Sequence, residues 1–134
     1  PLRRLFAFSR RTGKELWATD YPEEFKAPDP TAGKGPNATP AFDRDRVYTF
    51  GLGGVLLALD AATGKELWKH DCKAEFWGVK KGPLGDDVYF PPCGAAASPL
   101  VDGDTVIVNV GGPKGGAFAA FDRASGKLVW KALD

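Results

Sequence analysis

An eleven-residue phrase occurs three times in the 134 residues of this chain, and it limits the fold more strongly than any other feature. The copies read AFSRRTGKELW at 7–17, ALDAATGKELW at 58–68 and AFDRASGKLVW at 120–130. Their tryptophans lie 51 and 62 residues apart. A recurrence of this length predicts an array in which each copy closes one structural unit.

Each copy is predicted to be a β-hairpin, because alternating apolar and polar residues flank a polar turn. Asp60 and Asp122 end the first strand of their hairpins, where a carboxylate accepts backbone N–H groups of the turn. Gly64 and Gly126 supply the positive φ of a bulged hairpin loop. The first copy has Ser9 in place of the aspartate, which is a weaker form of the same turn cap.

Two further strands precede the second and third hairpins, since ATPAFDRDRVYTF aligns with ASPLVDGDTVIVN. Pro40 and Pro99 fall at strand starts, and DRDR or DGDT forms the turn that follows. The predicted unit is therefore a four-stranded antiparallel meander. We expect a partial unit at 1–20, whole units at 38–71 and 97–134, and connecting insertions, interpreted as loops, at 21–37 and 72–96.

Composition excludes several classes of protein. The chain is 43% hydrophobic and 26% charged, which is typical of a globular protein, and its net charge of +1 argues against a nucleic-acid partner. It contains no run of eighteen apolar residues, so no membrane span is expected in this segment. It also lacks methionine and a leader-like start, so either a leader was removed or, as the repeat favours, the chain is an internal piece of a longer protein.

The phrase resembles the tryptophan-docking motif of the pyrroloquinoline-quinone (PQQ) type β-propeller repeat family. Each copy has an alanine, a glycine six positions later and a tryptophan ten positions later. The resemblance implies that each tryptophan packs between its own alanine and the glycine peptide of the neighbouring blade, where a small residue leaves room and glycine exposes a bare peptide. The implied docking residues are Ala7, Gly13, Trp17, Ala58, Gly64, Trp68, Ala120, Gly126 and Trp130.

The resemblance implies an all-β fold, an arc of about two and a half four-stranded blades from a propeller that usually has eight. The segments VLLALD and VIVNV carry apolar residues on both strand faces, as expected for a blade buried between neighbours. The chain alone would then present two apolar blade faces and an unpaired edge strand at each end. Other blades of the same propeller are its first expected partners.

The amino-acid sequence of these repeats is most similar to that of exported bacterial PQQ-like repeat proteins. Among them is the outer-membrane β-barrel assembly lipoprotein, a cofactor-free propeller. This implies a location in the periplasm or cell envelope and a non-catalytic scaffold that binds another protein or an envelope polymer. One alternative is the propeller part of a quinoprotein dehydrogenase, which holds PQQ against adjacent cysteines with calcium or a lanthanide. This chain has no adjacent cysteines, so missing blades would have to supply that site. A third is the ligand-sensing ectodomain of a membrane kinase.

The residues outside the repeat yield two further expectations. Cys72 and Cys93 bracket the second insertion, and an even cysteine count in an exported protein predicts a disulfide between them. The cluster of His70, Asp71 and Cys72 matches no common zinc spacing, so we assign no metal site. No catalytic or cofactor-binding residue is assigned either.

Aromatic residues also gather in the insertions, where the repeat does not need them. Aromatic side chains tend to be buried, which favours a role in capping the end of the ring. Exposed on loops, the same residues would instead form a docking surface for a peptide or sugar. These residues are Phe25, Phe76, Trp77, Tyr89 and Phe90.

Overall fold

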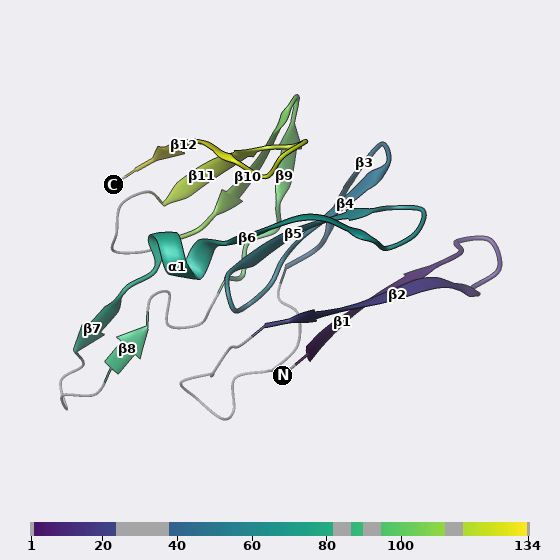
Figure 1. Cartoon of the computed structure of the whole chain (residues 1–134), viewed down its shortest axis with the longest axis horizontal. Helices are drawn as coiled ribbons and strands as arrows, with labels where there is room; N and C mark the ends of the chain where they lie inside the picture. Colours follow the sequence, from purple (N-terminus) through teal and green to yellow (C-terminus); the bar gives the residue numbers. More distant parts are fainter. Residues whose placement is uncertain (1, 24–37, 82–86, 90–94, 112–116, 134) are drawn as a thin grey trace.

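The computed structural model describes residues 2–23, 38–81, 87–89, 95–111 and 117–133. Its described strands form two four-stranded and two two-stranded sheets, all antiparallel. This confirms the all-β prediction. Three of them, called here the first, second and third sheets, lie one beside the next, with the second between the other two (Figure 1).

Each of these three sheets follows the chain. The first is a hairpin of β1 (Leu2–Phe8) and β2 (Glu15–Pro22). The second has the order β3 (Ala41–Asp43), β4 (Arg46–Phe50), β5 (Val55–Asp60) and β6 (Glu66–Asp71). The third consists of β9 (Leu100–Asp102), β10 (Thr105–Asn109), β11 (Phe118–Asp122) and β12 (Leu128–Ala132), whose neighbours in the sheet are also neighbours in the chain.

The three repeated hairpins share one local geometry. The pairing register shifts just after the alanine of each copy, and that alanine lies opposite the tryptophan of the same copy. The turn glycines Gly13, Gly64 and Gly126 have φ values of 68°, 73° and 72°. Such positive φ angles are strained for residues with a side chain, so the bulged turn depends on glycine.

Strand β5 is apolar on both faces because it lies between two other sheets. Leu56 and Ala58 belong to a core shared with the third sheet, whereas Leu57 and Leu59 pack with residues of the first hairpin, and all four are fully buried. Burying both faces replaces the simple alternation of a half-exposed strand with a continuous apolar run. The first and third sheets also carry exposed apolar residues, including Phe6, Phe8 and Val129.

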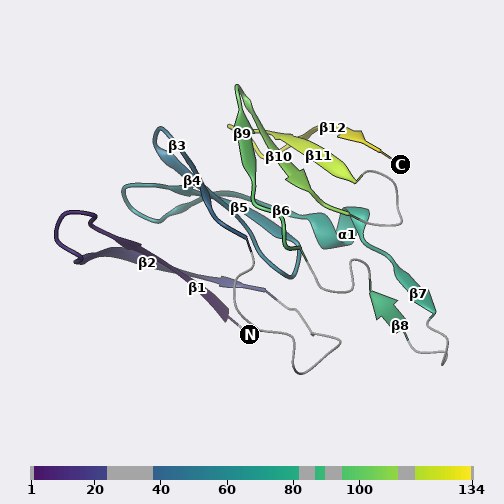
Figure 2. The ribbon, with the colours of Figure 1, turned by 180° about the vertical axis from the view of Figure 1, so that it is seen from behind.

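The insertion after β6 contains regular structure where the sequence predicted only a loop. A short helix, α1 (Cys72–Phe76), begins at Asp71, whose side chain accepts a hydrogen bond from the Ala74 N–H. A hairpin of β7 (Val79–Lys81) and β8 (Asp87–Tyr89) follows, extending from the helix away from the three sheets (Figure 2). The helix forms because its cap is satisfied and Cys72 and Phe76, four residues apart, are both buried. Within the described residues, no helix has the length and apolar character needed to cross a lipid bilayer.

The buried faces of β5 should dominate stability. We expect Leu57→Ala to lower the free energy of unfolding by about 2–5 kcal/mol, because it leaves a cavity between two sheets. Leu67→Ala on the adjacent strand β6 is the matched control, since Leu67 is an exposed leucine and its loss should cost under about 1 kcal/mol. Urea denaturation of both variants measures the difference, and equal losses would contradict burial of β5 between sheets.

Candidate functional site

The most specific contact between the second and third sheets joins Trp68 to Gly126. The Trp68 side chain leaves β6 and lies against the β11–β12 turn, and the residue is 8% exposed. A Cβ added at Gly126 would lie 2.6 Å from both Cδ2 and Cε3 of the indole. The indole Nε1 donates a hydrogen bond of 2.9 Å to the Arg123 carbonyl. The ring is therefore stacked on the turn backbone and hydrogen-bonded to it.

The same contact joins the first and second sheets. A Cβ at Gly64 would lie 2.5 Å from Cε3 of Trp17, whose Nε1 donates to the Ala61 carbonyl at 2.9 Å. The accepting carbonyl again belongs to the residue three positions before the glycine. Thr19 adds a hydrogen bond from its Oγ1 to the Gly64 carbonyl at 2.5 Å.

The first glycine and the last tryptophan of the repeat make no such contact among the described residues. Apart from Gly13 and its two chain neighbours, no heavy atom lies within 4 Å of the position that a Cβ would take at Gly13, and Trp130 is 41% exposed. The structure thus brings Trp17 to Gly64 and Trp68 to Gly126 and leaves one glycine and one tryptophan without such a contact among the described residues. That these contacts hold the blades together stays a prediction.

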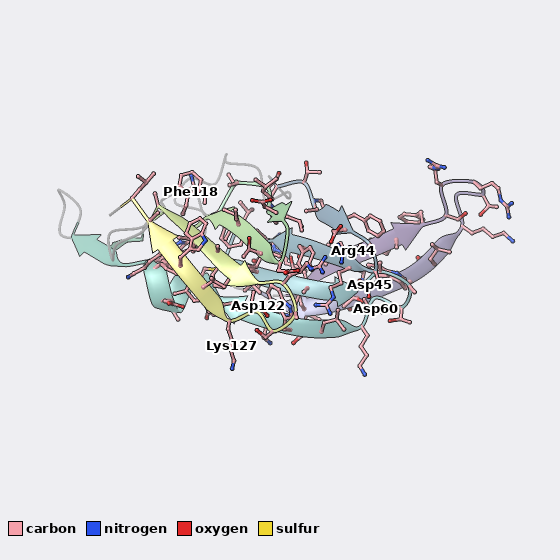
Figure 3. All side chains as sticks on the ribbon, turned by 90° about the horizontal axis from the view of Figure 1, so that it is seen from above. Arg44, Asp45, Asp60, Phe118, Asp122 and Lys127 are labelled. Carbon is pink, nitrogen blue, oxygen red and sulfur yellow. The ribbon has the colours of Figure 1, made fainter. Side chains whose placement is uncertain are left out.

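Asp60 and Asp122 lie at the start of the two turns whose glycines contact an indole, and their carboxylates accept hydrogen bonds from the turn (Figure 3). Asp60 Oδ1 accepts from the Thr63 N–H at 2.8 Å and the Thr63 hydroxyl at 2.7 Å. Asp122 Oδ1 accepts from the Ser125 N–H at 2.7 Å and the Ser125 hydroxyl at 2.6 Å. These bonds, the hydroxyl bond first, hold the pKa of each carboxyl below its ordinary value.

Two arginines, Arg46 and Arg123, make hydrogen bonds between the second and third sheets that were not identified from the sequence. The Arg123 guanidinium donates to the Asp43 carboxylate on β3, and Arg46 Nη1 donates to the Arg123 carbonyl at 2.6 Å. Arg123 therefore presents its carbonyl to Trp68 and its side chain to the second sheet. Only its position in the repeated phrase, directly after the turn aspartate, could have pointed to it.

Two of the aromatic residues considered for a loop docking surface are buried. Phe76 is 1% exposed and meets Phe121 edge to face, and Trp77 is 5% exposed and donates from Nε1 to the Val110 carbonyl at 2.7 Å. These two residues close the core at the end of the second and third sheets and are not available to a partner. Phe25, Phe90 and the Tyr89 side chain lie outside the described residues.

The cysteine and histidine positions carry local structural contacts. Cys72 is fully buried, and burial raises the pKa of its thiol. Cys93 lies outside the described residues, so the pairing of the two cysteines stays a prediction. His70 Nε2 lies 2.7 Å from Glu75 Oε2, and its ring contacts Phe121. Among the described residues, no three His, Cys, Asp or Glu side chains gather to hold a metal ion.

Comparison with known proteins decides the family. The family model described as outer membrane protein assembly factor BamB matches residues 3–134. The chain belongs to this family of PQQ-like repeats. The quinohemoprotein alcohol dehydrogenase ADH IIB of Pseudomonas putida is 34% identical over 131 residues, covering 96% of this chain and 17% of the relative. BamB of Shewanella oneidensis is 30% identical over 84 residues, covering 61% of this chain and 21% of the relative.

Solved structures show that the fold is a sector of a β-propeller. A europium-containing methanol dehydrogenase superposes with a TM-score of 0.67 and 26% identity, over 96% of this chain and 21% of that chain. BamB from Moraxella catarrhalis superposes with a TM-score of 0.57 and 22% identity, over 96% of this chain and 30% of that chain, which concerns the fold alone. The chain spans about one sixth of the length of its first curated relatives, at 17% and 16%.

The indole–glycine contact can be separated from backbone strain by two matched substitutions. Gly13→Ala and Gly126→Ala both place alanine at a positive φ, which costs about 1–2 kcal/mol. Only Gly126→Ala also drives a Cβ into an indole, and we expect a further loss of about 1–3 kcal/mol. Chemical denaturation gives the difference, and equal losses would show that Trp68 does not depend on the bare glycine.

The turn aspartates predict a defined pH dependence. Because their folded pKa values lie below the unfolded value of about 3.9, their contribution is fully present above that pH. It is lost as the pH falls through the lower folded pKa. Carboxyl NMR titration should place Asp122 below its ordinary pKa, and Ser125→Ala should raise that pKa while leaving Asp60 unchanged. A titration of Asp122 at or above the ordinary value would refute the cap.

Proposed function

We propose that this chain is a non-catalytic sector of an exported propeller that binds another protein or a cell-envelope polymer. The observation that carries the proposal is the pair of indole contacts, Trp17 on Gly64 and Trp68 on Gly126, which dock one sheet on the backbone of the next. Contacts of this kind make a rigid platform, and rigid platforms position loops for binding.

The family match supports this role, because the family model that covers residues 3–134 is described by an assembly factor. Location in the periplasm or cell envelope is part of the proposal. Binding would use loops at the strand ends and the axial surface of the complete ring, since function on a propeller resides in such grafted surfaces.

A second candidate is the propeller part of a PQQ-dependent dehydrogenase, favoured by the quinohemoprotein relative that is 34% identical over 96% of this chain. A lanthanide-dependent methanol dehydrogenase of Methylacidiphilum fumariolicum is also 34% identical, over 69% of this chain and 13% of the relative. The side chains of this chain that could bind PQQ or its metal ion do not form such a site by themselves. The sequence has no adjacent cysteines, and the described residues hold no metal-binding group of acidic, histidine or cysteine side chains. No catalytic step is therefore assigned to this chain.

Reconstitution separates the two candidates. The whole natural protein that contains this chain should be purified from its host's envelope fraction and incubated with PQQ and calcium or a lanthanide. The scaffold proposal expects no quinone absorbance, no dye-linked alcohol oxidation, and one specific partner retained by affinity capture. A quinohemoprotein alcohol dehydrogenase treated in parallel is the positive control.

A variant in the docked sector tests whether this chain takes part in binding. Trp68→Ala should weaken partner retention because it removes a buried indole and its hydrogen bond, whereas Lys127→Ala, at an exposed turn position, should not. Stoichiometric PQQ binding with alcohol oxidation would replace the scaffold proposal by the dehydrogenase one.

A further inference from the structure

A cavity of about 360 Å³ lies between the first hairpin and the second sheet. Its lining includes Arg3, Tyr21, Glu23, Thr49, Phe50 and Leu52. Ligand pockets usually measure about 300–1,000 Å³ and combine apolar walls with a few polar groups, so this cavity suits a small molecule.

Two buried oxygen atoms of the cavity residues have no hydrogen-bond partner. The Glu23 side chain is 1% exposed, and its Oε1 makes no hydrogen bond, while Arg3 Nε lies 3.2 Å from its Oε2. Thr49 is 5% exposed, and its Oγ1 also lacks a partner. Buried polar atoms are nearly always paired, because an unpaired one costs about 1–3 kcal/mol. Two of them beside one cavity point to a bound molecule.

Neither group is required by the repeat. Thr49 aligns with Val108 of the next unit. Both side chains are buried at the same strand position, but that of Val108 has no polar atom. Valine has nearly the shape of threonine without a hydroxyl, so the fold itself would be served better by valine at 49. Glu23 depends on Gly51, where an added Cβ would lie 1.9 Å from Glu23 Oε1. The chain therefore makes room for this carboxylate.

The charges around the cavity cancel in pairs. Arg3 pairs with Glu23, and Arg4 binds Asp20 through two hydrogen bonds of 2.5 and 2.6 Å. A charged ligand would be desolvated here without a compensating partner, which disfavours it. The ligand should thus be uncharged and should carry hydroxyl groups on one side and an apolar face on the other.

We propose that this cavity binds a neutral sugar. One sugar hydroxyl donates a hydrogen bond to Glu23 Oε1, and a second sugar hydroxyl forms a hydrogen bond with Thr49 Oγ1. The apolar face of the sugar packs on the wall formed by Tyr21 and Phe50. This site goes beyond the proposed scaffold role and does not depend on it, since it concerns only the first interface between sheets.

The test is titration of the chain, and of the whole natural protein, with D-glucose. We expect saturable binding by calorimetry, with chemical-shift changes at the Thr49 and Gly51 amides in NMR spectra. Thr49→Val should weaken binding roughly threefold to tenfold, as expected for one neutral hydrogen bond, and Glu23→Gln by about tenfold or more. Thr12→Val, in the exposed first turn, is the control and should bind as the parent does.

Two comparison ligands make the result decisive. Glucosamine and glucose 6-phosphate, which are charged, should bind at least tenfold more weakly than glucose. Thr49→Val keeps the test informative even if Glu23→Gln unfolds, because it preserves side-chain shape. The proposal is overturned if glucose leaves both amides unshifted, if a charged sugar binds more tightly, or if the whole protein does not bind.

Discussion

The stacking of an indole on a glycine peptide recurs between the described sheets, and we predict that this contact sets their arrangement. Glycine at a positive φ offers a bare peptide plane, and the indole stacks on it. The indole N–H also donates a hydrogen bond to the carbonyl of the residue three positions before the glycine. We therefore expect one contact to fix both the separation and the orientation of two sheets. Strand β5 lies between the two neighbouring sheets, which explains why that strand is apolar on both faces.

The two interfaces share backbone contacts and differ in their side chains. The carbonyls of Ala61 and Arg123 accept equivalent indole hydrogen bonds, so the side chain at this position is free to differ. Arg123 uses that freedom to bind Asp43, which alanine cannot do. Thr19, two residues after its tryptophan, bonds to the Gly64 carbonyl, whereas His70 at the equivalent position contacts Phe121. Such differences give each neighbouring pair its own complementarity.

Sequence periodicity predicted the elements that depend on local chemistry. The hairpins, their positive-φ glycines and the meander order follow from spacing and turn residues, because each needs only nearby positions. Helix α1 was not predicted. Burial of Phe76 and Trp77 was the favoured expectation for aromatic residues, but their partners Phe121 and Val110 could not be predicted, because they lie more than thirty residues away. The Glu23 carboxylate was missed for the same reason, since its place depends on Gly51.

Repeat architecture also shows where a chain departs from what folding alone requires. The positions where an indole contacts a turn are sterically constrained. Both interfaces therefore have glycine in the turn, at 64 and 126, and tryptophan on the facing strand, at 17 and 68. At the aligned positions 49 and 108 the demand is only for a buried side chain of valine shape, and valine meets it without an unpaired hydroxyl. A threonine retained there, beside a buried carboxylate, costs stability that the repeat does not need to lose. Stability lost at one interface of an otherwise regular array is the pattern expected where a binding function was added to a structural repeat.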